Sequence, residues 1–235
     1  PYVRAANIIK AYKADGYISV NGVKSYEAFF FINSVSDILK LIEYTDLQPE
    51  DVRIICANTE TNQKKLGKFQ IENSNCPNKK FTFLTCKSFE GVDYESDTAL
   101  CFVVSTASNA HTQASIDTDI PQIAGRIRTA NNPFRKLIIH IFNNTYKDLN
   151  LDVTYNDMKQ AVEDDLNAAN AIVKLLNSID DEKQRKMLIK SINNKYISTK
   201  NGKFVFYDTL PKLELYNYMV NQVIYKNGLS VKKAY

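Results

Sequence analysis

Five short, largely apolar runs are the feature that most constrains the fold of this chain. Each is five to seven residues long, and they lie at residues 28–32, 52–57, 80–85, 99–105 and 136–142. Strands that are apolar on both faces are typical of a parallel sheet covered by helices. A helix is expected after the first run, because Ser36 and Asp37 can cap an apolar helical face that continues to Tyr44. We therefore predict an α/β fold, with a parallel sheet flanked by helices.

Composition places few limits on the kind of protein. Of 235 residues, 44% are hydrophobic and 24% are charged, which is ordinary for a globular protein, and the net charge of +4 permits a nucleic-acid partner without demanding one. The four cysteines show no C-x-x-C spacing and there are two histidines, so we predict no metal site and reduced thiols in a cytoplasmic protein. We expect no membrane partner, because no apolar run is long enough to span a bilayer. The chain begins at Pro1, and we expect it to be a fragment or a chain whose first residues were removed by processing.

The pattern of the chain predicts three parts. Residues 1–25 are expected to be a lead-in helix and linker, residues 26–150 the α/β domain, and residues 151–235 a mostly helical extension. In the extension we predict helices at residues 155–178, 182–195 and 211–225, and a hairpin at residues 196–207. Asn201-Gly202 favours the two-residue turn of that hairpin.

Polar residues directly follow the predicted strands. In open parallel sheets the loops at the carboxyl ends of the strands form the ligand site. The residues so placed are Asn33, Ser34, Asn58, Thr59, Thr85 and the loop at residues 105–109. We expect them to gather at one edge of the sheet.

The string QIAGRIR at residues 122–128 carries two arginines. On the helix predicted at residues 120–129, Arg126 and Arg128 diverge by about 200°, so one of them at most can aim at a given phosphate. Gly125 lets another backbone approach closely, and Gln122 supplies an amide one turn before Arg126. Alone, such a string is typical of a surface helix with solvated arginines.

The string TCKSFEGVD at residues 85–93 directly follows a predicted strand. The Thr85 hydroxyl and the loop amides can hold a phosphate, and Gly91 permits a tight backbone path. Asp93 can accept a hydrogen bond from a ribose hydroxyl or orient an arginine. Alone, this string is typical of an ordinary turn.

The order and separation of these strings resemble a known family. Residues 85–93 and 122–128 resemble motifs V and VI, and residues 29–34 (FFFINS) resemble motif IV, of the second RecA-like lobe of superfamily 2 DEAD/DEAH-type helicases and translocases. The resemblance covers roughly residues 26–144. Most members place the second arginine where this chain has Thr129. The spacing in this chain resembles the subgroup around herpesvirus origin-binding proteins and some phage and mobile-element helicases.

The resemblance implies a role for each matching residue. Gln122 and Arg126 would face ATP on the first lobe, with Arg126 favoured for phosphate contact and Arg128 as arginine finger or support. Such a finger is worth ~10³–10⁵ in rate. The nucleotide would also be lined by Gly91, Asp93 and Gly125, and nucleic-acid backbone contacts would come from Asn33, Ser34, Asn58, Thr59 and Thr85. The strand is expected to be DNA, with RNA not excluded.

Two motifs of a complete motor are missing from the sequence. It contains no G-x-x-x-x-G-K-[ST] string and no acidic metal-binding motif after an apolar strand. ATP and Mg²⁺ are therefore expected to bind mainly on an absent first lobe, and this chain alone should not hydrolyse ATP.

Other interpretations of the same strings stay open. One is a stand-alone, non-catalytic RecA-like module that binds nucleic acid or a protein, and another is an unrelated α/β nucleotide-binding domain. His140 is expected to be a packed strand residue. The basic helix at residues 182–195 can track phosphates or simply face solvent, and its cations are Lys183, Arg185, Lys186 and Lys190.

Overall fold

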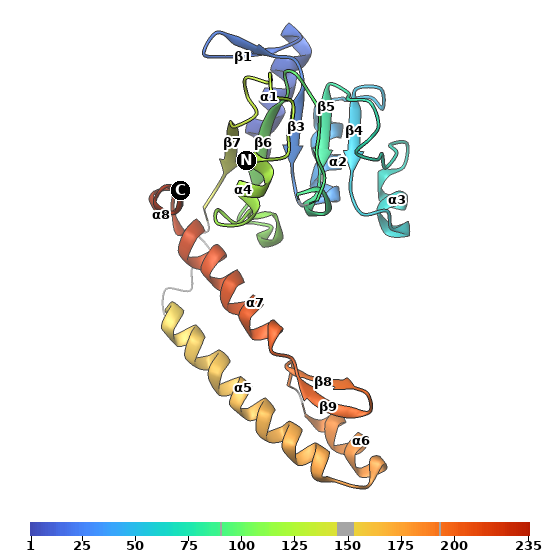
Figure 1. The fold of residues 1–235 in the computed structure, drawn as a ribbon, viewed down its shortest axis with the longest axis vertical. Helices are drawn as coiled ribbons and strands as arrows, with labels where there is room; N and C mark the ends of the chain where they lie inside the picture. Colours follow the sequence, from blue (N-terminus) through green and yellow to red (C-terminus); the bar gives the residue numbers. More distant parts are fainter. Residues whose placement is uncertain (90, 145–152, 193) are drawn as a thin grey trace. The chain divides into compact units, whose positions relative to one another are not determined.

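The computed structural model describes residues 1–89, 91–144, 153–192 and 194–235, which form two compact units (Figure 1). The first unit comprises Pro1–Thr145 and Asn227–Tyr235, and the second comprises Tyr146–Lys226. The expected domain boundary at residue 150 falls outside the described residues.

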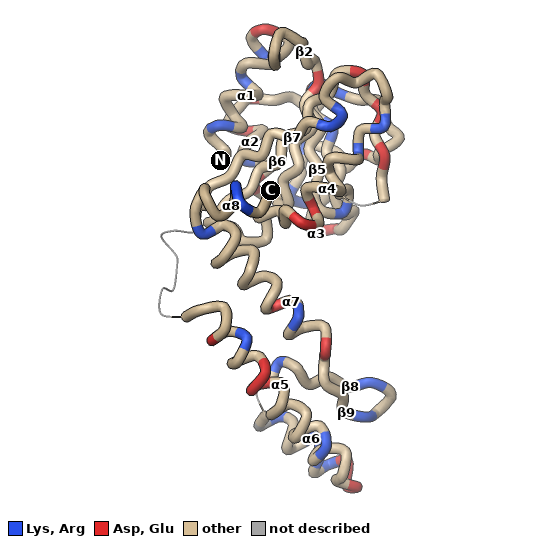
Figure 2. The backbone as a smooth tube through the Cα atoms, turned by 60° about the vertical axis from the view of Figure 1, so that its left-hand side comes forward, with Lys and Arg blue, Asp and Glu red and all other residues tan. Residues whose placement is uncertain are grey.

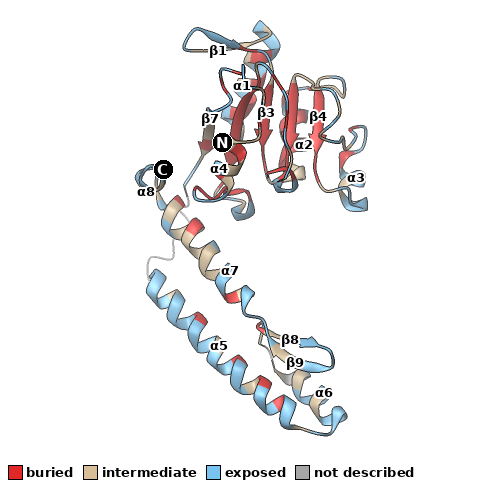
Figure 3. Ribbon diagram, in the orientation of Figure 1, coloured by how far each residue is buried: buried red, intermediate tan, exposed pale blue. Residues whose placement is uncertain are grey.

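The first unit contains a five-stranded parallel sheet, as the apolar runs predict. Its order is β4-β5-β3-β6-β7. The strands are β3 (Ala28–Phe31), β4 (Val52–Ile55), β5 (Phe81–Leu84), β6 (Leu100–Ser105) and β7 (Ile138–Phe142). Every residue of β3, β4, β5 and β6 is buried, because both faces of the sheet are covered (Figure 3). The predicted α/β class is confirmed.

Helices cover the two faces of this sheet unequally. Alternate residues of β3 point to opposite faces, so Phe30 belongs to one core and Phe29 to the other. The core around Phe30 includes Ile9 of α1 (Tyr2–Asp15) and Ile38 of α2 (Val35–Tyr44). The core around Phe29 includes Tyr94, which lies in a loop, and Ile123 of α4 (Asp119–Ala124). The expected lead-in helix is thus α1, and it packs into the core of this unit.

The connections of the sheet run in two directions from its centre. From β3 the chain passes through α2 to the edge strand β4, and through α3 (Glu60–Leu66) back to β5. It then crosses to β6 on the other side of β3 and continues to the opposite edge strand β7. The loops that follow β3 and β6 therefore diverge, and such a switch point is where open α/β sheets bind ligands.

A small hairpin of β1 (Ile18–Val20) and β2 (Val23–Ser25) and a terminal helix, α8 (Gly228–Ala234), complete the first unit. We expected the extension to run to Tyr235, but the last nine residues group with the first unit. Val231 of α8 is buried, and the Tyr235 hydroxyl lies 2.6 Å from His140 Nδ1. The sequence pattern predicts no helix after residue 225, and local pattern cannot say which core such a short segment joins.

The second unit is mostly helical, with one hairpin. It contains α5 (Tyr155–Ser178), α6 (Glu182–Ser191), β8 (Ile197–Lys200), β9 (Lys203–Phe206) and α7 (Thr209–Tyr218), followed by π and 3₁₀ turns at Met219–Val223 and Ile224–Lys226. The predicted hairpin is confirmed, and its turn residues Asn201 and Gly202 have φ values of 52° and 74°. These are the positive values that a two-residue hairpin turn requires.

Candidate functional site

The two motif-like strings lie side by side, because Tyr94 and Ile127 form a parallel β-bridge. Tyr94 N donates to Arg126 O at 2.8 Å, and Arg128 N donates to Tyr94 O at 2.9 Å. Both side chains at the bridge are buried in the core that contains Phe29. The backbone therefore fixes Asp93 beside the arginine string.

The prediction that Arg126 and Arg128 lie on one helix is wrong. Helix α4 ends at Ala124, and the arginines flank the bridge residue Ile127. Residues two apart along an extended segment lie on the same side, so both guanidinium groups reach Asp93. The Asp93 Oδ1 atom lies 2.8 Å from Arg128 Nε and 3.8 Å from Arg126 Nη1. Pairing with Tyr94 replaces the helical hydrogen bonds that the periodicity favoured.

The two arginines differ in what holds them. Arg126 donates from Nε to Gln122 O at 2.8 Å and from Nη1 to Val92 O at 3.0 Å, and its side chain is 14% exposed. The Arg128 side chain is 51% exposed and that of Asp93 is 56% exposed. Arg126 therefore ties two segments together, while Arg128 presents its guanidinium to solvent.

The two glycines of this region have different structural roles. Gly91 has a φ of +69°, in the left-handed region that other residues rarely adopt, and it turns the chain into Asp93. Gly125 has a φ of −91°, and a Cβ placed there would lie 3.7 Å from its nearest neighbour, Gln122 O. A close backbone approach therefore does not explain Gly125. Glu90 lies outside the described residues.

Gln122 remains chemically unexplained within this unit. Its Oε1 atom is buried and accepts no hydrogen bond in the described structure. Leaving a buried acceptor unsatisfied costs about 1–3 kcal/mol. Gln122 is thus the predicted site residue whose polar group most clearly lacks a structural role.

A polar hollow of about 510 Å³ lies at the carboxyl ends of the strands, at the switch point. Its lining includes the predicted residues Asn33, Ser34, Thr85 and Asn109, and also Lys40, Lys65 and His111. Asn33 joins three loops, because its Oδ1 accepts from Cys86 N at 3.2 Å and its Nδ2 donates to His111 O at 2.9 Å. Sequence reasoning missed the two lysines, which lie on helices rather than directly after a strand.

Asn58 and Thr59 do not line this hollow. Thr59 caps α3 by accepting from Asn62 N at 3.2 Å, and Asn58 Oδ1 accepts from Gln63 Nε2 at 2.7 Å. Both side chains therefore have local roles in starting a helix. Asn62, one turn further on, is the residue of this segment that lines the hollow.

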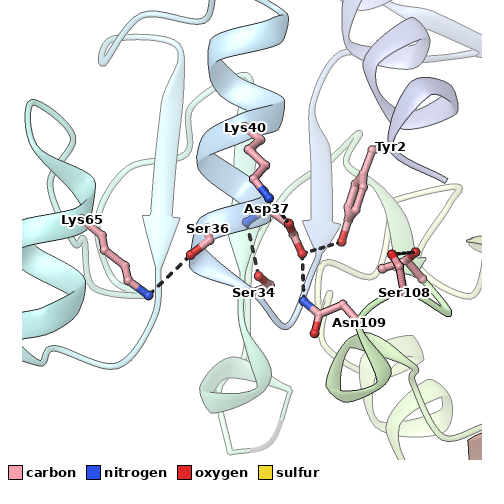
Figure 4. A network of polar contacts seen from close by, with 9 residues as sticks. Tyr2, Ser34, Ser36, Asp37, Lys40, Lys65, Ser108 and Asn109 are labelled. Carbon is pink, nitrogen blue, oxygen red and sulfur yellow. Dashed lines mark hydrogen bonds and ion pairs between the residues drawn. The ribbon is translucent and has the colours of Figure 1, made fainter.

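Asp37 organises the charges of the hollow (Figure 4). Its carboxylate accepts from the Tyr2 hydroxyl and from Asn109 Nδ2, each at 3.0 Å, and from Lys40 Nζ at 3.3 Å. Burial raises the pKa of Asp37, but these hydrogen bonds outweigh that effect and hold the pKa below its ordinary value. Lys65 Nζ donates to Ser36 Oγ at 3.4 Å, linking α3 to α2. The Lys40 side chain is 76% exposed and can meet an anion entering the hollow.

Comparison of the chain with models of protein families, with curated protein sequences and with solved structures finds no match. Within the described ranges, no three His, Cys, Asp or Glu side chains gather in a way that could hold a metal ion. None of the described helices combines the length and apolar character needed to cross a membrane.

Proposed function

We propose that the first unit is the second RecA-like lobe of an ATP-dependent helicase or translocase that acts on DNA. The observation that carries the proposal is the contact between Arg128 and Asp93, from two strings that resemble motifs VI and V. The five-stranded parallel sheet and its covered faces are consistent with a RecA-like lobe. The spacing within each string and the geometry between them are independent observations that agree.

In this proposal Arg128 is the arginine finger, rather than Arg126. An arginine finger must extend its guanidinium from one lobe to the phosphates bound on another. Arg128 is exposed and held by one carboxylate, whereas Arg126 already donates to two backbone carbonyls. Arg126 then positions the segment, and Asp93 keeps Arg128 oriented before the lobes close.

ATP and Mg²⁺ would bind mainly on a first lobe that this sequence does not contain. The sequence lacks a phosphate-binding loop, which supports that division. From this chain, Arg128 would approach the nucleotide phosphates and the unsatisfied Gln122 Oε1 would accept a hydrogen bond once the site is closed. When bound on the first lobe, Mg²⁺ would supply positive charge for the transferring phosphoryl group, and the Arg128 guanidinium would add to it.

The hollow at the switch point is proposed as the contact with the nucleic-acid strand. Lys40 and Lys65 supply positive charge, and Asn33, Ser34 and Thr85 supply polar groups for a phosphate backbone. Contacts of this kind bind any sequence and weaken with salt. RNA offers the same phosphates, and the choice of DNA rests on the family resemblance.

The decisive experiment measures DNA-stimulated ATPase activity in a protein that joins a first lobe to this chain. Arg128→Ala is expected to lower kcat by ~10³-fold or more. Arg135→Ala, at another exposed arginine, is the matched control and should leave kcat unchanged. Equal activity of Arg128→Ala and the control would refute the finger assignment.

A second candidate is a non-catalytic module that binds nucleic acid. It is favoured by the hollow at the switch point, whose lysines and polar side chains could contact a phosphate backbone without a nucleotide site. DNA binding that persists while no first lobe restores ATPase activity would select this candidate over the motor.

A further inference from the structure

The second unit concentrates positive charge at α6 and the hairpin (Figure 2). Residues 183–212 contain eight Lys or Arg residues and one acidic residue, Asp208. Two of the lysines form ion pairs, Lys186 with Glu182 at 2.7 Å and Lys195 with Glu214 at 2.8 Å. With the flanking Asp180, Asp181, Glu182 and Glu214 counted, residues 180–214 carry a net charge of +3, and the cations near the hairpin turn are Lys200 and Lys203.

Lys200 and Lys203 face each other across the hairpin turn. They are direct cross-strand partners, one at the end of β8 and the other at the start of β9. Like charges directly opposite each other destabilise a hairpin. Both side chains are exposed, and neither forms an ion pair with any residue that the structure describes. This arrangement costs stability and would be relieved by a bound anion.

A hollow of about 440 Å³ lies beside this pair. Its lining includes Lys200, the acidic Asp208 and two aromatic residues, Phe206 and Tyr207, and Phe206 lies on the opposite face of the hairpin from Lys200 and Lys203. Phe206 is 41% exposed and Tyr207 is 52% exposed, so both rings are accessible from solvent. Proteins that bind single strands combine positive charge for the phosphates with aromatic rings on which bases stack.

The hairpin backbone is anchored to α5 and closed at its base. Asn177 of α5 donates from Nδ2 to Phe204 O at 2.8 Å and accepts from Phe204 N at 3.0 Å. The Tyr207 backbone N–H donates to Tyr196 O at 2.6 Å, which closes the base of the hairpin. Neither contact uses the Tyr207 ring, so the ring can be changed without removing them.

We propose that this hollow binds single-stranded nucleic acid, with a base stacked on Tyr207 and phosphates at Lys200, which lines the hollow, and at its cross-strand partner Lys203. This extends the proposed function to the second unit but requires no nucleotide hydrolysis. An anionic membrane is the less favoured partner, because the hairpin presents Asn201-Gly202 between two lysines at its turn. Surface-bound membrane segments instead place apolar side chains at the inserted end.

The test is the binding of a fluorescent oligothymidylate to the 235-residue chain, measured by anisotropy at several salt concentrations. Tyr207→Ala should raise Kd about fivefold or more, whereas Tyr207→Phe should keep the affinity because it keeps the ring. Lys200→Ser should weaken binding and reduce the slope of log Kd against log salt by about 0.7. Tyr44→Ala and Lys174→Ser are matched controls at an exposed tyrosine and an exposed lysine elsewhere in the chain.

Two further variants separate this proposal from the strand contact proposed for the first unit. If Lys40→Ser and Lys65→Ser weaken binding while Tyr207→Ala does not, the hairpin proposal is overturned and the first-unit contact stands. If Tyr207→Ala weakens binding and the Lys40 and Lys65 variants do not, the hairpin proposal stands without that contact. Binding to anionic phospholipid vesicles that depends on Tyr207, with no oligonucleotide binding, would overturn it in favour of a membrane. Circular dichroism confirms that each variant is folded.

Discussion

Arg128 donates from Nε to Asp93 Oδ1 at 2.8 Å, although the two residues are 35 positions apart in the chain. The bridge between Tyr94 and Ile127 brings them together, since these bridge residues are adjacent to Asp93 and Arg128 in sequence. The backbone hydrogen bonds of the bridge, rather than the ion pair, therefore hold Asp93 and Arg128 next to each other. Removing the ion pair is therefore expected to change the stability of the fold little but to lower the proposed activity.

Asp93→Asn is expected to change stability little. Both partners are about half exposed, and an exposed ion pair contributes about 1 kcal/mol or less. In a protein that contains both lobes, the same change should lower ATPase activity, because Arg128 loses its orienting carboxylate. Urea unfolding of the 235-residue chain measures the first effect and steady-state kinetics the second. A loss of stability well above 1 kcal/mol would mean that the pair holds the fold.

Gly91 and Gly125 differ in backbone conformation, so replacing each by alanine compares a strained position with an unstrained one. Gly91→Ala should destabilise the chain by about 1 kcal/mol or more, because its φ of +69° is strained for a residue with a Cβ. Gly125→Ala should be neutral or stabilising by up to about 1 kcal/mol, because its φ is negative and the added Cβ has ordinary contacts. Denaturant unfolding of the two variants side by side gives the comparison. Equal losses would contradict the geometric distinction.

The sheet could be predicted from sequence because buried parallel strands leave a simple signal. Each of the five expected runs contains an observed strand, since continuous apolar runs have few other uses in a chain of this composition. The hairpin at Asn201-Gly202 was predictable for a similar reason, because few sequences favour positive φ at two successive residues.

The arrangement of the arginines could not be predicted from local pattern. Residues 120–128 have helical periodicity, but a tertiary hydrogen-bond pair with Tyr94 draws Arg126 and Arg128 out of the helix. Lys40 and Lys65 were missed because helix positions near the switch point are set by the crossover geometry rather than by distance along the chain. Long-range backbone pairing and helix placement are the two elements that local sequence does not encode.

Arg53 is buried in the core beneath Tyr94, and its substitution measures how much this packing contributes to stability. It is 1% exposed, with its guanidinium 5.6 Å from the Phe29 ring centroid and 5.7 Å from that of Tyr94. Its Nε donates to Thr82 Oγ1 at 3.2 Å and its Nη1 to Cys76 O at 2.7 Å, but its Nη2 is buried and has no hydrogen-bond partner among the described residues. Arg53→Ala should cost about 3 kcal/mol or more, because it leaves a cavity beneath Tyr94. Arg53→Met should cost less, because it fills the space without a buried charge. Thermal unfolding of both variants measures the two losses of stability. Equal losses would show that removal of the charge, rather than the cavity, destabilises the chain.

The first-unit hollow should bind phosphates through its lysines. Lys40→Ser and Lys65→Ser are expected to weaken DNA binding and to lower its salt dependence, because each removes one phosphate contact. Lys10→Ser, at an exposed lysine of α1 outside the hollow, is the control. Titrations at three salt concentrations measure the slopes. Unchanged slopes in both variants would remove the hollow from the proposed interface.

Because His140 is partly buried in the folded chain, we expect the chain to lose stability in mild acid. Burial lowers the pKa of His140 to about 4, from an ordinary value of 6.5, and its ring contacts the Ser105 and Tyr235 hydroxyls. A histidine that is neutral when folded contributes stability that is present above pH 6.5 and is lost as the pH falls toward 4, by about 3 kcal/mol at most. Because carboxylates also titrate in this range, His140→Asn is the needed comparison. Urea unfolding at pH 7 and pH 4.5 should show a smaller pH effect in the variant than in the unmodified chain. The same effect in both would mean that His140 can be protonated without disturbing the packing of Tyr235 against β7.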